Sequence, residues 1–399
     1  MTKRVCLVSG GNVSTNPRLV NAADALQAAG HRVRVVAVDA LPENAERDAA
    51  VMRDRTWRLD RVNLRHGDIV GTAHRVAAKL RQVANRRPER VMSPYADVLT
   101  RAASAEPADV VLGYTFGGLP VAVHAAERLG AIAGFDIEDL HAGERPDEPQ
   151  YAAAQQVAVD VERRYLPRCR TLTAASEGIA DAVAAAYGVP RPLVVLNTFP
   201  LAERPAELVQ RRGPPSLYWY SAVIGTDRGI EDALGAMALL DVPVELHLRG
   251  SISPQHRAQL EARAARLGVA RRLFLWPQAP PPELVSLAAQ HDIGLALELG
   301  ATRSRRIAVT NKLLVYLLAG IAVAATDIPG QRGILDAAPG AGFLYPPGDT
   351  AALAAGLESL LANLANAKAA ARMAGERRFN WEAEAPRLVR YLAEAWGTS

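Results

Sequence analysis

The sequence contains little that could form covalent or metal-based cross-links. Its 399 residues include only two cysteines, Cys6 and Cys169. They lie far apart and show neither a CxxC nor a Cys/His spacing, so the pattern predicts neither a disulfide framework nor a zinc site. Cysteine used this sparingly fits a reducing compartment, and we expect a cytoplasmic protein.

Long hydrophobic runs are missing as well. The N-terminus, MTKRVCLVSGG, has only a short apolar run before its glycines, which predicts a first strand rather than a signal peptide. The apolar run 313–325 is too short for a membrane span and is interrupted at Gly320. Short tandem repeats are also absent. These absences favour an ordinary globular chain.

What the sequence does contain is enough apolar material for sizeable cores. Hydrophobic residues make up 49% of the chain and charged residues 22%, as in ordinary globular proteins. A length of 399 residues is long for one core, so two domains are expected. The net charge of +4 suits phosphate-bearing small molecules or an anionic surface, and we expect no nucleic-acid partner.

Strands and helices are predicted to alternate in two successive sets. Short apolar runs bounded by turn residues predict strands at 4–9, 32–38, 109–113, 131–137, 171–174, 193–197, 216–221, 244–250, 272–277, 292–297 and 321–325. Helical periods predict helices at 17–29, 118–129, 254–267, 281–290 and 382–396. Strands that are apolar on both faces belong in parallel sheets covered by helices, so the pattern indicates βαβ units.

The two sets predict two domains. The segment 201–215 is rich in proline and arginine and has no sustained period, so it is predicted to be a linker. We therefore expect an α/β protein with two Rossmann-like, doubly wound domains facing across a cleft. The first comprises residues 1–200, joined by a C-terminal helix at about 382–399, and the second comprises residues 216–381.

A glycine-rich corner follows the first strand of each predicted domain. Gly10 and Gly11 form the first corner, and Gly225 and Gly229 flank Arg228 in the second, SAVIGTDRGIEDAL. Neither corner is a GxGxxG or Walker loop, but each lets the backbone approach an anion at a helix N-terminus. A guanidinium at the second corner could bind a diphosphate through two parallel hydrogen bonds.

Several motifs together resemble those of a known family. The segment NKLLVYLLAGIAVAATDIPG resembles the second-domain signature of retaining nucleotide-sugar glycosyltransferases of family 4, which have the GT-B fold. IGTDRGIEDAL is similar to the diphosphate loop of that family, and FDIEDLHAGE is similar to its acidic and histidine-bearing segment. The opening SGGNVSTNPRLVNAADALQAAGHRVRVV resembles the first βαβ unit of the family. The resemblance extends over almost the whole chain.

This resemblance implies a function as well as a fold. It implies a retaining hexosyltransferase that needs no metal ion and no cofactor beyond its co-substrate, a dTDP-, UDP- or GDP-sugar. The second domain would hold this donor. The first domain would hold a small-molecule, glycan or lipid-linked acceptor.

The resemblance also assigns roles to individual residues. Arg228 would stabilise the leaving diphosphate, and His141 would lie close to the transferred sugar. The residues implied on the donor side are Gly225, Gly229, Arg249, Trp276, Gln278, Asn311, Lys312 and Val315. Those implied on the acceptor or sugar side are Gly10, Gly11, Asn16, Arg18, Glu138 and Asp139.

Two positions depart from the family pattern. Ile307 and Val315 stand where the family has a pair of glutamates, of which the later one holds the ribose. Valine accepts no hydrogen bond, so we expect a thymidine-diphosphate sugar, with its deoxyribose, to be tolerated or preferred. Alternatively, Val315 only packs beneath its helix and Asp327 holds the ribose. The missing carboxylates also leave open a GT-B sugar-nucleotide epimerase or a non-catalytic GT-B partner protein.

Two further segments have more than one interpretation. Asp136, Glu138 and Asp139 could chelate a divalent ion or simply cap a helix, as alternatives to the acceptor-side role. The segment 75–101 carries many basic residues among apolar ones at helical spacing. This pattern is typical of a solvated helix face, and it also suits weak peripheral contact with a membrane surface or an anionic acceptor.

Overall fold

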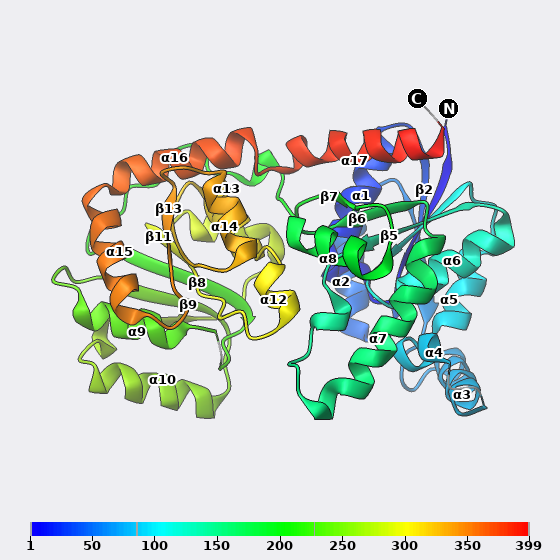
Figure 1. The fold of residues 1–399 in the computed structure, drawn as a ribbon, viewed down its shortest axis with the longest axis horizontal. Coiled ribbons are helices and arrows are strands. Elements are labelled where there is room, and N and C mark those ends of the chain that lie inside the picture. The colour runs from blue at the N-terminus through cyan, green and yellow to red at the C-terminus, as the bar shows by residue number, and fades with distance from the viewer. Residues whose placement is uncertain (1, 85–86, 227, 398–399) are drawn as a thin grey trace. The chain divides into compact units, whose positions relative to one another are not determined.

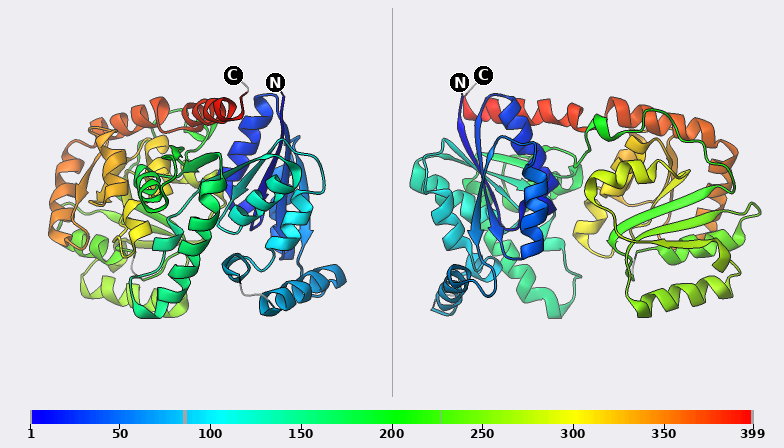
Figure 2. Two further views of the ribbon diagram at one scale, coloured as in Figure 1. Left: turned by 45° about the vertical axis from the view of Figure 1, so that its right-hand side comes forward. Right: turned by 180° about the vertical axis from the view of Figure 1, so that it is seen from behind.

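The computed structural model describes residues 2–84, 87–226 and 228–397 (Figure 1). The chain forms two compact units. The first comprises Met1–Val195 and Ala385–Ser399, and the second comprises Leu196–Glu384. Each unit has its own parallel sheet, with helices on both faces (Figure 2).

The sheet of the first unit has seven parallel strands in the order β3-β2-β1-β4-β5-β6-β7. Its strands are β1 (Arg4–Ser9), β2 (Arg32–Asp39), β3 (Arg58–Asn63), β4 (Val110–Tyr114), β5 (Ile132–Ile137), β6 (Thr171–Ala174) and β7 (Leu193–Val194). Its helices are α1 (Pro17–Ala28), α2 (Pro42–Met52), α3 (Ile69–Ala84), α4 (Pro88–Met92), α5 (Ala96–Ala103), α6 (Gly118–Leu129), α7 (Ala152–Tyr165) and α8 (Glu177–Tyr187). The last helix, α17 (Trp381–Trp396), belongs to this unit from Ala385 onward.

The sheet of the second unit has six parallel strands in the order β10-β9-β8-β11-β12-β13. Its strands are β8 (Ser216–Val223), β9 (Glu245–Ser251), β10 (Leu273–Trp276), β11 (Ile293–Ala296), β12 (Ala322–Thr326) and β13 (Gly342–Tyr345). Its helices are α9 (Ile230–Leu239), α10 (Pro254–Arg266), α11 (Leu284–Ala288), α12 (Arg303–Ile307), α13 (Asn311–Ala319), α14 (Pro329–Asp336), α15 (Thr350–Ala362) and α16 (Leu364–Arg377). The two sheets confirm the predicted doubly wound α/β class.

Two apolar clusters cover the two faces of the second sheet. Leu217 and Trp219 of β8 belong to one cluster, and the alternate residues Tyr218 and Tyr220 belong to the other. This alternation follows from the two-residue period of a strand. Both faces are buried, which explains why the strands appear in the sequence as continuous apolar runs.

Helix α13 packs very closely against the sheet. Gly294 of β11 makes this possible, because a Cβ atom there would lie 2.2 Å from the Tyr316 ring. The Tyr316 hydroxyl donates a hydrogen bond to the Leu295 carbonyl at 3.1 Å. The helix ends at Gly320, whose φ of 71° is in the left-handed region that favours glycine. Strand β12 begins at Ala322, two residues after this glycine and within the predicted strand 321–325.

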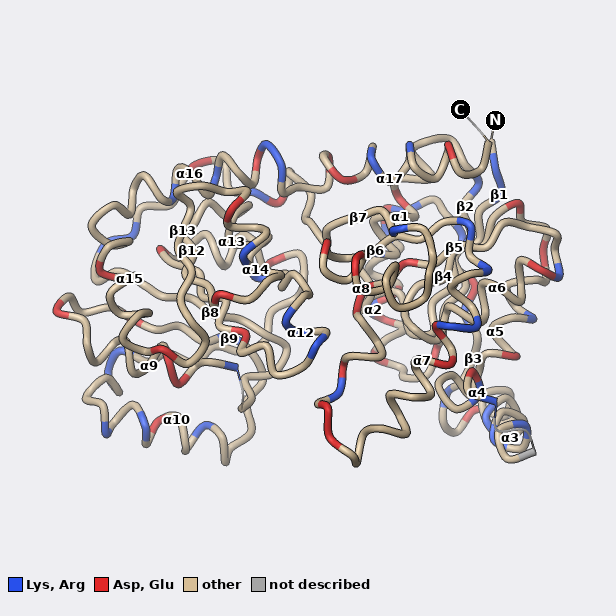
Figure 3. The backbone as a smooth tube through the Cα atoms, in the orientation of Figure 1, with Lys and Arg blue, Asp and Glu red and all other residues tan. Residues whose placement is uncertain are grey.

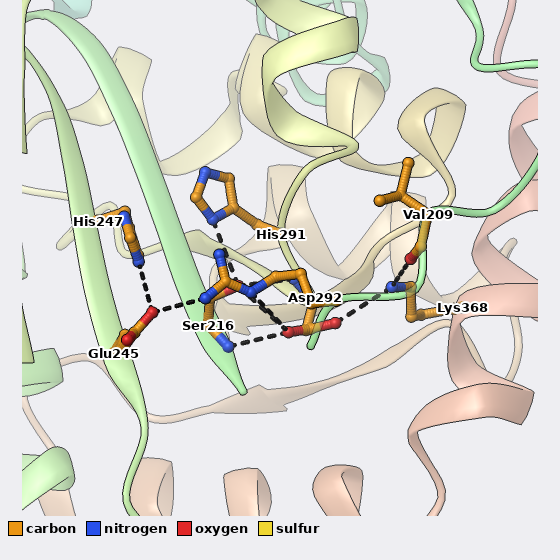
Figure 4. A network of polar contacts seen from close by, with 8 residues as sticks. Val209, Ser216, Glu245, His247, His291, Asp292 and Lys368 are labelled. Atoms are coloured by element: carbon orange, nitrogen blue, oxygen red, sulfur yellow. Dashed lines mark hydrogen bonds and ion pairs between the residues drawn. The ribbon is translucent and has the colours of Figure 1, made fainter. Parts of the chain in front are cut away.

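The segment 201–215, predicted as a linker, is part of the second unit in this structure. Lys368 of α16 donates a hydrogen bond to the Val209 carbonyl at 3.0 Å and forms an ion pair with Asp292 at 3.2 Å. Asp292 in turn accepts hydrogen bonds from the Ser216 backbone and hydroxyl (Figure 4). Arg211 also contributes, with an ion pair to Glu245 at 2.6 Å. This network fastens the segment to the amino ends of the strands.

None of the helices in the described part of the chain combines the length and the apolar character that a membrane crossing requires.

Candidate active site

The strand orders locate the candidate site. The order reverses between β1 and β4 in the first unit and between β8 and β11 in the second. Ligands of open α/β sheets bind beyond the carboxyl ends of the strands at such reversals. The loops that follow these four strands therefore form the candidate ligand-binding edges of the two sheets.

At the reversal in the first unit, the loops after β1 and β4 are tied together. The Gly10 backbone N–H donates a hydrogen bond to Thr115 Oγ1 at 3.0 Å. A Cβ atom at position 10 would lie 3.1 Å from the Gly117 Cα, so glycine permits this close approach. Among the described residues, Thr115 is the one non-glycine residue with a positive φ, 58°. Such strained residues cluster at ligand sites, and Gly11, half-buried, follows in the same corner.

His141 is held firmly beside these loops. Its ring stacks on Phe116, with centroids 4.1 Å apart and planes 12° from parallel. Its Nδ1 lies 3.2 Å from Oε1 of Glu162, and the Glu162 carboxylate is only 1% exposed. The other oxygen of this carboxylate accepts a hydrogen bond from the Tyr187 hydroxyl. When Nδ1–H donates to this carboxylate, the neutral ring presents Nε2 as an acceptor. A histidine oriented in this way can bind a hydroxyl or accept a proton.

Glu138 and Asp139 follow β5 at the same edge of the sheet. Both are half-buried, and no described residue forms a hydrogen bond with the Glu138 carboxylate. Burial raises the pKa of Glu138, an effect that Arg18 opposes and the nearby Asp136 and Asp139 reinforce. Glu138 is therefore a carboxyl group with free hydrogen-bonding capacity, available to a ligand.

Arg18 has a different position from the one expected. It is 5% exposed, and its guanidinium donates to both oxygens of Asp136, at 2.7 and 2.6 Å, and to the Val195 carbonyl at 2.7 Å. Asn16 is 3% exposed and caps α1 by accepting a hydrogen bond from the Leu19 backbone. The structure thus buries both residues in the interior of the unit, where the Arg18 guanidinium is engaged by Asp136 and the Val195 carbonyl.

The ion pair between Arg18 and Asp136 also affects whether Asp136, Glu138 and Asp139 could chelate a divalent metal ion. Asp136 accepts hydrogen bonds from Arg18 and, at 2.5 Å, from the Thr173 hydroxyl, so its oxygens are already engaged. Within the described parts of the chain, no three His, Cys, Asp or Glu residues are grouped so that they could hold a metal ion. The cluster predicted as a possible chelate therefore divides into one structural carboxylate and two available ones.

In the second unit, the loop after β8 leads into α9 through Gly229. This glycine has a φ of 70°, and a Cβ atom there would lie 2.3 Å from the Leu297 carbonyl oxygen. The N-cap residue contributes no side-chain hydrogen bond, and the Ile230 and Glu231 backbone N–H groups have no acceptor among the described residues, whereas the Asp232 N–H donates to the Gly229 carbonyl at 3.1 Å. Arg228 is half-buried and forms no hydrogen bond or ion pair with any described residue, while the half-buried Gly225 lies earlier in the loop. An unpaired guanidinium beside an uncapped helix N-terminus is an anion-binding arrangement.

Arg249 lies near the carboxyl end of β9, and Trp276 is the last residue of β10. They are direct neighbours in the register of β9 and β10. The Arg249 guanidinium lies 5.9 Å from the centre of the Trp276 ring and donates to the Pro277 carbonyl at 2.9 Å. Trp276 is 43% exposed, and its Nε1 donates to His247 Nδ1 at 3.1 Å. Together with the exposed Gln278, these groups form a cationic and aromatic rim.

Glu298, which the sequence analysis did not identify, follows β11 at the strand reversal and forms polar contacts with Lys312, Thr310 and Gln331. Its Oε1 lies 2.5 Å from Lys312 Nζ and accepts a hydrogen bond from the Thr310 hydroxyl at 3.2 Å. Its Oε2 accepts a hydrogen bond from Gln331 Nε2 at 2.7 Å. Burial opposes ionisation of this carboxyl, but the charge and hydrogen bond of Lys312 outweigh it and lower the Glu298 pKa. Lys312 is thus neutralised within the protein.

The remaining donor-side predictions lie at or below the start of α13. Asn311 is exposed, and its Oδ1 accepts a hydrogen bond from Asn197 at 3.1 Å. Val315 has no exposed surface and packs inside an apolar cluster, so it lies in the core of the unit and not on a nucleotide-binding surface. Asp327, the alternative ribose ligand, forms a two-pronged ion pair with Arg332 at 2.8 and 2.6 Å.

Sequence reasoning missed several residues for identifiable reasons. Glu298 directly follows the predicted strand 292–297, and Thr115 comes two residues after the predicted strand 109–113. Their positions after strands, like that of Gly10, could have identified them. Glu162 and Gln331 lie within helices, where no local signal marks them. Their importance comes only from the partners that the fold brings to them.

Comparisons with known proteins agree with this geometry. Residues 15–198 match a family model described as a glycosyl transferase 4-like domain, and residues 214–363 match one described as glycosyl transferases group 1. No curated protein matches the sequence.

Among solved structures, a glycosyltransferase from Rickettsia africae is similar, with a TM-score of 0.73, 14% identity and 100% of both chains covered. Anabaena HepE in complex with UDP gives a TM-score of 0.71 at 14% identity, covering 98% of this chain and 100% of that one. Sucrose-phosphate synthase from Thermosynechococcus elongatus gives 0.70 at 17% identity, with 100% of both chains covered. The chain belongs to the family 4-like glycosyltransferases of GT-B fold.

Proposed function

We propose that the protein is a retaining glycosyltransferase that moves a sugar from a nucleoside-diphosphate sugar to an acceptor hydroxyl. The observation that carries this proposal is the unpaired Arg228 beside the uncapped N-terminus of α9. When the bond between the sugar and the diphosphate breaks, negative charge develops on the leaving oxygen. Preorganised N–H groups and a fixed cation at that point stabilise the transition state more than the ground state.

We propose further that the reaction needs no metal ion. Arg228 and the α9 N–H groups supply the positive potential that a divalent cation supplies in metal-dependent phosphate chemistry. Arg249, on the neighbouring strand, adds a second cation at the same edge of the sheet. Transfer in the presence of excess chelator is therefore expected to proceed unchanged. Loss of activity that returns on adding Mg²⁺ or Mn²⁺ would contradict this part of the proposal.

For the donor we propose a uridine-diphosphate sugar. Anabaena HepE has been solved with UDP-glucose and with UDP and glucose, and S. aureus TarM has been solved with UDP. The earlier expectation of a thymidine donor depended on Val315 facing the ribose, and this side chain is fully buried. The exposed Trp276 ring offers a stacking surface for the base, with Arg249 above it.

For the acceptor we propose a hydroxyl of a small molecule, a glycan or a lipid-linked sugar, bound by the first unit. His141 carries this assignment, because its ring is fixed by Phe116 and Glu162 and its Nε2 forms no hydrogen bond with a described residue. We propose that Nε2 binds a sugar hydroxyl. The Glu138 carboxyl, also without a hydrogen-bond partner in the described chain, would bind a second hydroxyl.

A donor panel tests the proposal. The purified protein is incubated with UDP-, dTDP- and GDP-sugars, and the products are separated by anion-exchange chromatography. Release of the nucleoside diphosphate with transfer or slow hydrolysis of the sugar supports a glycosyltransferase. An epimerised sugar nucleotide would indicate the epimerase alternative. Binding by calorimetry without any product would indicate a non-catalytic partner protein, and absence of both binding and turnover would refute the nucleotide-sugar assignment.

A further inference from the structure

Helix α3 (Ile69–Ala84) exposes more large apolar surface than a helix of a soluble unit normally does. Ile69 is 87% exposed, Val76 53%, Leu80 64% and Val83 69%. Scattered exposed aliphatic residues are ordinary, but a contiguous group of them marks a contact surface. The helix lies at the margin of the first unit (Figure 1).

These four side chains form a single stripe along the helix. At 3.6 residues per turn, positions 69, 76, 80 and 83 fall within an arc of about 60°. The opposite side carries Gly71 and Ala78, which are buried against the unit. A Cβ atom on Gly71 would lie 2.4 Å from the Arg65 carbonyl oxygen, so this side fits closely. Small residues thus face the protein and large apolar residues face outward, the reverse of an ordinary surface helix.

The helix is also basic. Its sequence, IVGTAHRVAAKLRQVA, contains Arg75, Lys79 and Arg81 and no acidic residue. Lys79 is exposed, forms no ion pair with any described residue, and lies about 80° from Ile69 around the helix, beside the stripe. In Figure 3, segments coloured as Lys and Arg lie at α3. An apolar stripe with flanking cations complements a surface that has a negatively charged outer layer and an apolar layer under it.

We propose that the outward face of α3 binds an anionic lipid membrane. Ile69, Val76, Leu80 and Val83 enter the boundary between headgroups and acyl chains, while Lys79 stays at the level of the lipid phosphates. The helix lies in the plane of the surface and does not cross it. A second copy of the chain fits this face less well, because pairing through the stripe would bring two basic helices together. The proposal is independent of the glycosyltransferase assignment.

Vesicle sedimentation with the full-length protein tests the proposal. Large vesicles of phosphatidylcholine alone are compared with vesicles that contain equal parts of phosphatidylcholine and phosphatidylglycerol. Binding to the anionic vesicles is expected, together with a several-fold decrease when the salt concentration is raised from about 50 mM to about 500 mM. The double variant Leu80→Ser/Val83→Ser is expected to lower the partition coefficient at least about tenfold, because it removes two exposed aliphatic side chains from the stripe.

Matched controls separate this effect from general surface changes. Leu239→Ser/Val242→Ser removes two aliphatic side chains of similar exposure, 56% and 48%, from the second unit, and binding within about twofold of the wild type is expected. Lys79→Glu reverses a charge and leaves the stripe unchanged. It is expected to weaken binding to the anionic vesicles but not to the vesicles of phosphatidylcholine alone. Thermal melting curves verify that the variants are folded.

Three results would overturn the proposal. The first is no binding of the wild type to anionic vesicles. The second is equal binding of the wild type and the folded Leu80→Ser/Val83→Ser variant. The third is a lipid-free dimer of the wild type in analytical ultracentrifugation that this variant converts to a monomer, since the stripe would then be a contact between two copies of the chain.

Discussion

Replacing Arg228 with alanine gives the sharpest test of the proposed chemistry. Arg228 is half-buried and unpaired among the described residues, so its removal leaves no buried partner without a hydrogen bond. Stability should therefore change by less than about 0.5 kcal/mol. Removing one preorganised donor from a transition state that develops negative charge typically costs about 3 kcal/mol. We expect kcat to fall by about two orders of magnitude, with a smaller change in KM.

The assay is steady-state release of nucleoside diphosphate, with the melting temperature measured in parallel. Arg228→Lys keeps the charge but loses the two-pronged geometry, and it is expected to retain only part of the activity. Arg257→Ala is the matched control, because Arg257 lies on α10 of the same unit in an exposed pair with Glu261. If folded Arg228→Ala turns over within about threefold of the wild type, Arg228 does not stabilise the leaving group.

Three further predictions concern stability. Val315→Glu places a carboxylate in the apolar core, so it should lower the free energy of unfolding, measured in urea, by at least about 3 kcal/mol. A variant that keeps full stability and changes its nucleotide preference would contradict the burial of this position. Glu298→Ala leaves the Lys312 ammonium, 10% exposed, without its partner, and should cost about 3–5 kcal/mol by the same measurement; an unchanged free energy would refute the pairing. Burial and the nearby Glu382 raise the pKa of Glu203 to about 7. Between the ordinary carboxyl pKa and pH 7, the folded chain therefore keeps a proton on Glu203 that the unfolded chain has released. The stability that this proton contributes is lost as the pH rises through 7. Glu203→Gln should therefore raise the melting temperature at pH values above about 7 and leave it nearly unchanged near the ordinary carboxyl pKa; equal shifts at both would exclude this titration.

Much of the fold could be predicted from local patterns. The predicted strand 4–9 and the start of the predicted helix 17–29 coincide with β1 and α1, because a buried parallel strand is a continuous apolar run and Asn16-Pro17 is a strong helix start. Strand β3 was missed because half of its sequence, RLDRVN, is charged and the strand is only partly buried at the sheet edge. Strand β13 was missed because GFLY is only four residues long.

The site was harder to predict because its electrostatics depend on contacts between distant segments. Arg18 and Asp136 are 118 positions apart, yet they form a buried ion pair that engages the polar atoms of both side chains. His141 and Glu162 are 21 positions apart, and this contact is what orients the imidazole. A sequence shows which residues carry charge at the strand ends. Only the packing shows which of those charges are already neutralised.

The cations of the second unit illustrate the difference between charges that the protein neutralises and charges that remain free to bind a ligand. Lys312 is neutralised by Glu298, and Arg249 has one nitrogen engaged by the Pro277 carbonyl. The Arg228 side chain has no hydrogen-bond or ion-pair partner among the described residues. A leaving diphosphate needs positive potential that no carboxylate already neutralises, because a paired cation must give up its partner before it can bind the ligand. The pairing of Lys312 therefore supports our proposal that Arg228 and the N-terminus of α9, with Arg249 in support, stabilise the leaving group.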